Sequence, residues 1–172
     1  QKVNRMLLQE YIPLGQRVKA FTVEYKEDIY VGYRWADKQQ IKPLFAFGHG
    51  LSYTEFTYGD AKVSKNSVKA GADVSVSVDV TNTGKVAGKE VVQLYIGDEQ
   101  SRLERPVKEL KGFSKIALEP GETKTVTFSI DPEKLMYFDD EKHEWVLEDG
   151  KFTAYVGSAS DDIRTQVSFE VR

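Results

Sequence analysis

Apolar and polar side chains alternate with a period of two from about residue 59 onward, and this pattern restricts the fold more than any other feature. In "ADVSVSVDVTN" one face carries Val74, Val76, Val78 and Val80, and the other carries Ser75, Ser77 and Asp79. Successive side chains of a strand point to opposite faces of its sheet. The segment is therefore predicted to be a half-buried antiparallel strand.

Four more segments repeat the alternation, at residues 90–97, 123–130, 151–158 and 165–171. The residues predicted to face the core are Val92, Leu94, Ile96, Val126, Phe128, Ile130, Phe152, Ala154, Val156, Val167, Phe169 and Val171. Turn signals rich in glycine, asparagine and proline separate the segments at 82–88, 119–122 and 148–150. Regularly spaced strands with no amphipathic helix between them predict an all-β fold, an antiparallel β-sandwich.

Residues 1–58 follow a different pattern. The segment is rich in aromatic residues, lacks clear periodicity and contains no self-contained core, apart from a predicted short helical turn before Pro13. We expect residues 1–58 to form an extended connecting arm that packs against another part of the protein. Residues 59–172 are expected to form the sandwich and to fold alone.

Composition excludes several functions. The net charge is −3 with scattered lysine and arginine, which disfavours nucleic-acid binding. No apolar run reaches the roughly 20 residues of a membrane helix. The chain has no cysteine, so disulfides and thiolate metal sites are excluded while the compartment stays open. His49 and His143 are the only histidines and form no ligand pair, and a metal site is not expected.

The segment "LFAFGHGLSYTEF" at residues 44–56 could be a catalytic loop, a ligand-binding loop or a rigid bend. Tyr53 replaces the third glycine of a dinucleotide motif, and Thr54 replaces the last glycine of a nucleophile elbow. No cofactor and no catalytic residue is therefore predicted. For His49, a structural role and a contact with a ligand or a neighbouring domain both stay open.

Two acidic stretches have simple structural interpretations. Asp139–Glu141 and Asp161–Asp162 are predicted to be solvated hairpin tips, and nothing suggests the facing carboxyl pair that glycosidase chemistry needs. Trp145 alternates with Leu147 and is predicted to lie in the core.

Four ordered motifs carry a family resemblance. "YKEDIYVGYRW" (25–35), "PLFAFGHGLSYTEFTY" (43–58), "NTGKVAGKEVVQLYI" (82–96) and "RPVKELKGFSKIALEPGETKTVTF" (105–128) resemble the C-terminal part of glycoside hydrolase family 3, the β-glucosidase and β-xylosidase family. The match covers about residues 22–172. Asp28 stands where the family usually has glycine, and Ala46 stands where proline usually precedes Phe47.

The resemblance implies a fibronectin type III-like sandwich that follows a (β/α)8-like barrel and an α/β sandwich. In this family a barrel Asp is the nucleophile of a retaining mechanism, and in many members a Glu of the α/β sandwich is the acid/base. This chain contains neither, looks like a piece of a longer enzyme, and is predicted to be inactive alone. Its expected partners are those upstream catalytic domains and, through the parent enzyme, a β-glycoside substrate.

The resemblance also assigns roles to the arm. The residues expected to pack between domains are Tyr33, Trp35, Phe45, Phe47, Tyr53 and Phe56. The loop at 44–56 is expected to be structural first, with Gly48 and Gly50 in backbone conformations that favour glycine, and His49 is the residue to test at the rim of the sugar pocket. A stand-alone carbohydrate-binding or scaffold module is the alternative. A periplasmic or extracellular location is favoured over a cytoplasmic one.

Overall fold

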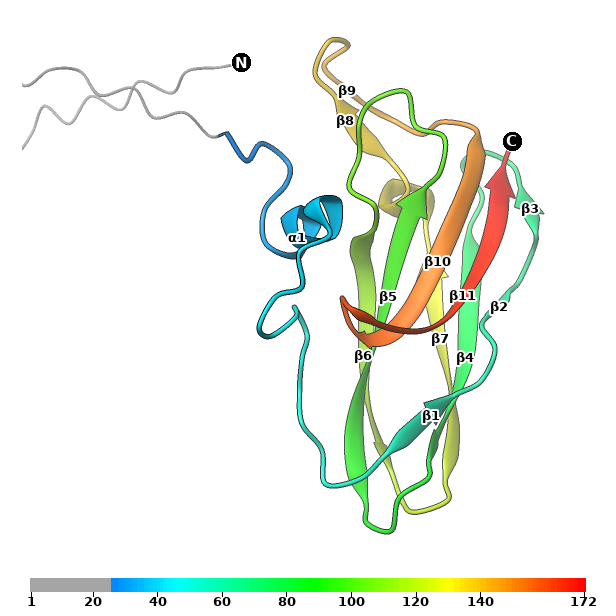
Figure 1. Cartoon of the computed structure of the whole chain (residues 1–172). Helices are drawn as coiled ribbons and strands as arrows, with labels where there is room; N and C mark the ends of the chain where they lie inside the picture. Colours follow the sequence, from blue (N-terminus) through cyan, green and yellow to red (C-terminus); the bar gives the residue numbers. More distant parts are fainter. Residues whose placement is uncertain (1–25) are drawn as a thin grey trace, which may run out of the picture.

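The computed structural model describes residues 26–172 and is a two-layered β-sandwich with one short α-helix beside it (Figure 1). The predicted helical turn before Pro13 lies outside the described residues. The elements are α1 Tyr33–Gln39, β1 Phe56–Tyr58, β2 Lys62–Val63, β3 Ser67–Val68, β4 Val74–Asn82, β5 Gly88–Asp98, β6 Glu109–Leu118, β7 Thr123–Ile130, a 3-10 turn Pro132–Lys134, β8 Tyr137–Asp139, β9 Glu144–Val146, β10 Gly150–Ala159 and β11 Asp162–Val171. None of the helices within residues 26–172 is long and apolar enough to cross a membrane.

The first sheet is built around β4. β7 pairs along the whole of β4, from Val74–Ile130 to Thr81–Thr123, so the short strands β1 and β2 occupy the other edge. The second sheet has the order β3-β11-β10-β5-β6, in which β3 and β11 run parallel and the other pairs run antiparallel. β8 and β9 form a separate hairpin at the end of the sandwich that also holds the C-terminus (Figure 1).

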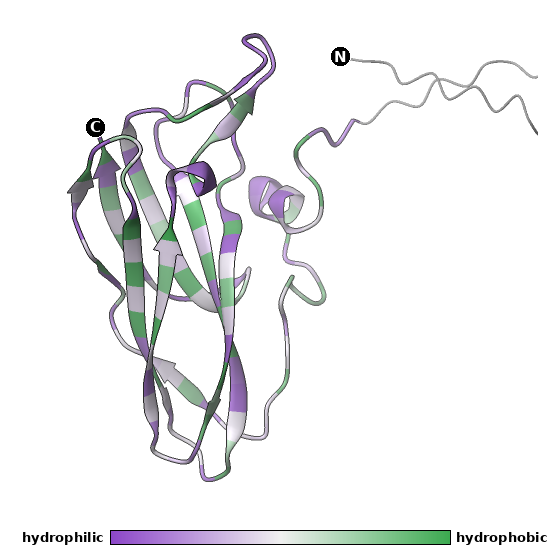
Figure 2. Cartoon of the chain, turned by 180° about the vertical axis from the view of Figure 1, so that it is seen from behind, coloured by the Kyte–Doolittle hydropathy of each residue, from purple (hydrophilic) through white to green (hydrophobic). Residues whose placement is uncertain are grey.

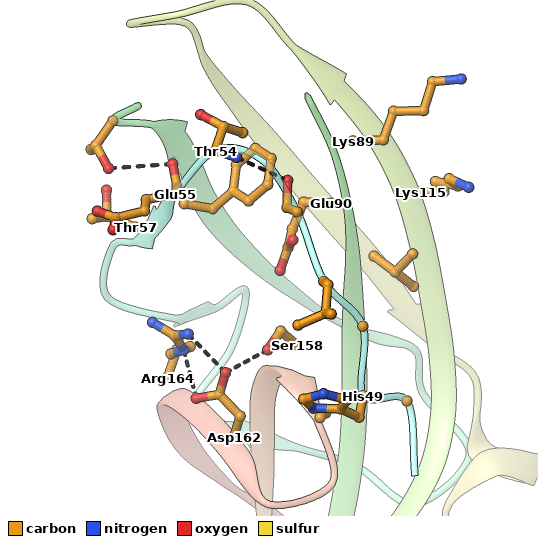
Figure 3. A pocket seen from close by; sticks show the side chains of 18 of the residues that line it. His49, Thr54, Glu55, Thr57, Lys89, Glu90, Lys115, Ser158, Asp162 and Arg164 are labelled. Carbon is orange, nitrogen blue, oxygen red and sulfur yellow. Dashed lines mark hydrogen bonds and ion pairs between the residues drawn. The ribbon is translucent and has the colours of Figure 1, made fainter. Parts of the chain in front are cut away.

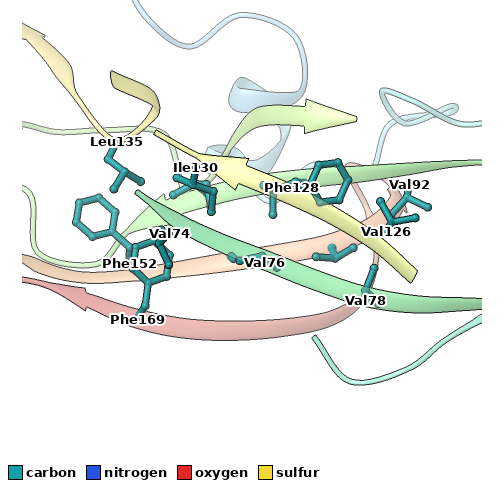
Figure 4. Packing of buried hydrophobic residues seen from close by; sticks show 14 of the residues in the cluster. Val74, Val76, Val78, Val92, Val126, Phe128, Ile130, Leu135, Phe152 and Phe169 are labelled. Atoms are coloured by element: carbon teal, nitrogen blue, oxygen red, sulfur yellow. The ribbon is translucent and has the colours of Figure 1, made fainter. Parts of the chain in front are cut away.

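The core lies between the two sheets and confirms the predicted alternation. Figure 2 shows apolar and polar bands alternating along the strands, and Figure 4 shows the inward side chains interdigitating. The four valines of β4 and the predicted inward residues of β5, β7 and β10 are all buried, and Val167 of β11 packs against them while partly exposed. Close packing of these branched side chains supplies the main hydrophobic stabilisation.

β5 departs from the alternation because both of its faces are covered. Gln93 and Tyr95 point away from the core, yet their exposed fractions are only 3% and 0%. The cover comes from the arm, whose helix α1 and following loop lie against the outer face of this sheet. The sequence predicts an extended arm, whereas "YRWADKQ" forms helix α1 because the seven residues include good helix formers and no glycine or proline.

The β8–β9 hairpin corrects two predictions. The predicted tip is present, but Asp139 is fully buried instead of solvated. It accepts hydrogen bonds from the Arg102 guanidinium and from the backbone N–H groups of Glu141 and Lys142. Trp145 is 66% exposed instead of buried, since only one side of this two-stranded sheet faces the sandwich.

Candidate functional site

Helix α1 is fixed to the second sheet by aromatic packing. The Tyr33 ring stacks on Phe47 at 5.1 Å between centroids and meets the edge of Tyr95 at 5.7 Å. The Tyr33 hydroxyl accepts a hydrogen bond of 2.8 Å from the backbone N–H of Leu110 in β6. Tyr33 therefore packs against the sandwich of this same chain, and its polar end completes the hydrogen bonding of the edge strand.

Ion pairs add a second set of contacts between α1 and the region around β6. Asp37 lies 2.5 Å from the ammonium of Lys108, and both side chains are largely buried. Arg34 lies 2.9 Å from Glu109. Because the first pair is shielded from water, it orients the helix more strongly than an exposed pair would.

The loop after α1 is held at a close approach to β5. Gly48 has φ +84°, and a β carbon there would collide with the side-chain amide of Gln93. Just before it, the carbonyl of Phe47 accepts a 2.9 Å hydrogen bond from the N–H of Ser160. Gly48 is thus needed both for its backbone angle and for space. The prediction that Gly50 also adopts a backbone conformation favouring glycine was wrong. Its φ is not positive, and nothing lies within 4 Å of its β position.

The arm is fastened again where it enters the first sheet. The Thr54 hydroxyl donates to Asn82 Oδ1 at 2.6 Å, and the Asn82 amide donates to the carbonyls of Val86 and Leu118. Phe56 then packs against the core as the first residue of β1. Between Gly48 and Thr54 the arm has no such anchor, so Leu51 and Tyr53 project into solvent with exposed fractions of 95% and 102%.

The six residues predicted to pack between domains divide into two groups. Tyr33 and Phe56 pack on this chain's own sandwich. The exposed group is Trp35, Phe45, Phe47 and Tyr53, at 44%, 71%, 50% and 102%. Phe47 combines the two, since one side of its ring contacts Tyr33 while half of its surface stays open.

A pocket of about 730 Å³ lies between the unanchored part of the arm and the sandwich (Figure 3). His49 and Ser52 line it from the arm. Glu90 lines it from β5, and Ser158, Asp162 and Arg164 line it from the β10–β11 turn. His49 is exposed, and its ring lies 5.4 Å from that of Phe45. No local sequence signal marks Glu90 or Arg164 as pocket residues. The two lie more than 70 residues apart in the sequence and meet only in the folded chain.

The polar groups of the pocket are ordered by their own contacts. Tyr58 donates to Glu90 Oε1 at 2.7 Å. Arg164 contacts Asp162 through both Nε and Nη2 at 2.7 Å, and the Ser158 hydroxyl donates to Asp162 at 2.5 Å. Burial raises the pKa of the Glu90 carboxyl above its usual value, although the bond from Tyr58 acts in the opposite direction.

Metal binding finds no support in this part of the chain. Across residues 26–172, no three histidine, aspartate or glutamate side chains converge in an arrangement that could hold a metal ion. Asp139 and Asp162, the two buried or half-buried carboxylates of the acidic stretches, are engaged by Arg102 and Arg164 instead.

Comparison with known proteins agrees with this architecture. Residues 90–160 match the family of fibronectin type III-like domains. The chain is 55% identical over 147 residues to β-glucosidase BoGH3A of Bacteroides ovatus, and the match covers 86% of this chain but 20% of that protein. It is 50% identical over 149 residues to thermostable β-glucosidase B of Acetivibrio thermocellus, again with 20% of the relative covered.

Solved structures give the same result. The β-glucosidase of Kluyveromyces marxianus superimposes with a TM-score of 0.77 and 47% identity, covering 85% of this chain and 18% of that one. β-Glucosidase 3B of Thermotoga neapolitana superimposes with a TM-score of 0.78 and 41% identity, covering 85% and 20%. The chain thus spans about a fifth of the length of these relatives. It belongs to the fibronectin type III-like domains found in the C-terminal region of glycoside hydrolase family 3 β-glucosidases.

Proposed function

We propose that this chain is the C-terminal accessory and stabilising domain of a retaining β-glycosidase of the β-glucosidase type, which hydrolyses β-linked glycosides. The nucleophile and the acid/base belong to preceding domains, and this chain supplies a docking surface for them. The proposal is supported by the relatives, which are named β-glucosidases and are about five times longer than the match. One structural observation carries it.

That observation is the concentration of exposed apolar side chains on the arm. Nine of the fourteen exposed large hydrophobic residues within the described part of the chain fall between residues 29 and 53. They are Ile29, Val31, Trp35, Ile41, Leu44, Phe45, Phe47, Leu51 and Tyr53, here called the arm surface. Soluble monomers rarely expose so much apolar area in one region unless a partner covers it.

Except at Leu51 and Tyr53, the arm surface is also held in place before any partner arrives. α1 is fixed by Tyr33 and Lys108, and the loop is fixed at Gly48 and at Thr54. A surface that is already ordered loses little conformational entropy on docking, which favours a stable contact between domains. The occupant we propose is the preceding catalytic portion of the same polypeptide.

The alternative of an independent carbohydrate-binding module has less support. Such a module needs aromatic rings in one plane, whereas the exposed pair Phe138 and Trp145 are inclined by 71°. His49 is included in the proposal as a residue near the rim of the sugar pocket, because it is exposed on the arm beside Phe45.

The test compares parent enzymes that differ only in this domain. Leu51→Ser with Tyr53→Ser in the parent enzyme is expected to lower its melting temperature and its rate on an aryl β-glucoside, because the docked apolar contact is lost. Phe113→Ser is the matched control, since Phe113 is 70% exposed but lies on β6, outside the arm surface. Equal melting temperatures and rates for the double variant and the control would refute docking through the arm. His49→Ala is expected to raise KM, and an unchanged KM would remove His49 from the sugar pocket.

A further inference from the structure

The pocket beneath the arm has the properties of a ligand site in its own right. We propose that it binds a small neutral polyhydroxylated molecule, such as a hexose, through Glu90, Arg164 and the free edge of β5. The pocket shares Leu51 with the arm surface, but Glu90 and Arg164 lie on the sandwich, so binding to them can be tested without a docked domain.

The floor of the pocket is a strand edge without a strand partner. β10 pairs with β5 only from Phe152–Asp98 to Gly157–Gln93, whereas β5 begins at Gly88. Lys89, Glu90 and Val91 line the pocket from this extension. Within residues 26–172 no backbone hydrogen bond joins them to the arm that passes beside them. Backbone donors and acceptors on this edge are therefore available to the hydroxyl groups of a ligand.

Glu90 supplies a partly satisfied carboxylate. It is half-buried, and in the described structure its single hydrogen bond is the one from Tyr58 to Oε1. A carboxylate has about four acceptor sites on its two oxygens. Oε2 is therefore left to accept a hydrogen bond from a ligand. Burial disfavours the charged form of Glu90, and a hydroxyl group that donates to Oε2 would offset part of that cost.

The opposite wall presents a rigid set of donors and acceptors. Arg164 uses Nε on Oδ1 and Nη2 on Oδ2 of Asp162, which leaves Nη1 to donate, and the Ser158 hydroxyl also donates to Oδ2. The side chains are thereby fixed before a ligand enters (Figure 3). Such an array suits neighbouring hydroxyl groups, which both donate and accept.

Charge and size favour a neutral ligand over an ion. Three basic and four acidic side chains line the pocket: Lys89, Lys115, Arg164, Glu55, Glu90, Asp161 and Asp162. Since Arg164 and Asp162 neutralise each other, neither sign dominates. The volume of about 730 Å³ falls in the usual range for small-molecule sites. Phe56 is the one large aromatic residue among the lining, so we expect a dissociation constant on the order of 1–10 mM.

The experiment is a titration of the 172-residue chain with D-glucose and with cellobiose, followed by the amide resonances in two-dimensional NMR. We expect saturable shifts confined to residues 48–57, 89–91 and 158–164. Glu90→Ala should weaken binding roughly tenfold, as expected for loss of a hydrogen bond to a charged group. Ser158→Ala removes the hydrogen bond to Asp162 and leaves the Tyr58–Glu90 bond in place, and it should weaken sugar binding as well. Glu170→Ala, a β11 carboxylate outside the pocket, should leave it unchanged.

Three outcomes would overturn the site. Shifts that stay linear and spread over the surface would mean that the sugar does not bind there. Saturable shifts centred on Phe138 and Trp145 would move the site to the hairpin. Shifts at Glu90 and Arg164 that appear only when the preceding part of the enzyme is added would mean that protein fills the pocket. Because the titration uses this chain alone, its failure is separate from failure of the docking proposal.

Discussion

The ring of Tyr33 lies 5.1 Å from that of Phe47, and this contact joins helix α1 to the loop that follows it. The Tyr33 hydroxyl also accepts from the N–H of Leu110. Helix, loop and edge strand therefore behave as one unit, and Tyr33 is its central residue.

Tyr33→Phe keeps the ring contacts and removes the acceptor of the Leu110 N–H. We expect a loss of about 1–3 kcal/mol for leaving a partly buried donor unpaired. The loss should appear as faster hydrogen exchange at Leu110 and in α1, with little change in β4 and β7. Tyr155→Phe is the control, because the Tyr155 hydroxyl has no hydrogen-bond partner within the described residues. Equal exchange in the two variants would show that the hydroxyl contributes nothing.

Gln40→Gly should stabilise the protein. Gln40 caps the C-terminus of α1 with φ +54°, a left-handed conformation that costs a residue with a side chain roughly 1–2 kcal/mol. Gln39→Gly, one residue earlier and inside the helix, should instead destabilise by about 1 kcal/mol. Chemical unfolding of both variants checks the opposite signs, and a loss of stability with Gln40→Gly would contradict the prediction.

Gly48→Ala should detach the loop from β5. Alanine would be strained at φ +84° and would push against the Gln93 amide. We expect the Ser160 N–H, which donates to Phe47, to lose protection against exchange by a factor that corresponds to roughly 1–3 kcal/mol. Gly50→Ala should be close to neutral because its β position is open. Similar effects of the two changes would mean that the close approach to Gln93 is unimportant.

Asp139→Asn should change the pH dependence of stability. Burial alone would raise the pKa of Asp139, but the N–H groups of Lys142 and Glu141 and the Arg102 guanidinium together hold it below its usual value. A carboxyl whose pKa is depressed on folding stabilises the protein above its unfolded pKa of about 3.9, and this contribution is lost as pH falls through the lower folded pKa.

The amide that Asp139→Asn introduces cannot titrate, so the variant should be less stable at pH 7 and should lose less stability on acidification. Urea unfolding at pH 7, 4 and 3 measures the difference. Asp140→Asn is the control, because Asp140 is the exposed neighbour. A parallel pH dependence for wild type and Asp139→Asn would rule out this role.

Local patterns predicted the sandwich well, because each valine of β4 has its burial set by the strand period. The burial of Gln93 and Tyr95 was not predicted, because the residues that cover them, 33 and 48, lie far away along the chain. The predictions for Trp145 and Asp139 were wrong for a related reason. A small hairpin has one covered face, and Asp139 is held on that face by Arg102 and by the backbone N–H groups of Glu141 and Lys142.

Asp28 illustrates what a family resemblance adds. It stands where the family usually has glycine, and its backbone is in the left-handed region at φ +53°, which aspartate tolerates better than most residues. The predicted division into 1–58 and 59–172 stays a prediction. The pocket could not be predicted from sequence, because β1, β5 and the β10–β11 turn meet only in the folded chain.

The two anchors of the arm have a mechanical consequence. Tension applied from the N-terminal side reaches α1 first, where the Lys108–Asp37 pair and Tyr33 bear the load. The unanchored span between Gly48 and Thr54 then provides slack before any force reaches β1. Such a load would accordingly enter the sandwich through β6 and the adjacent Lys108, and β1 would be spared.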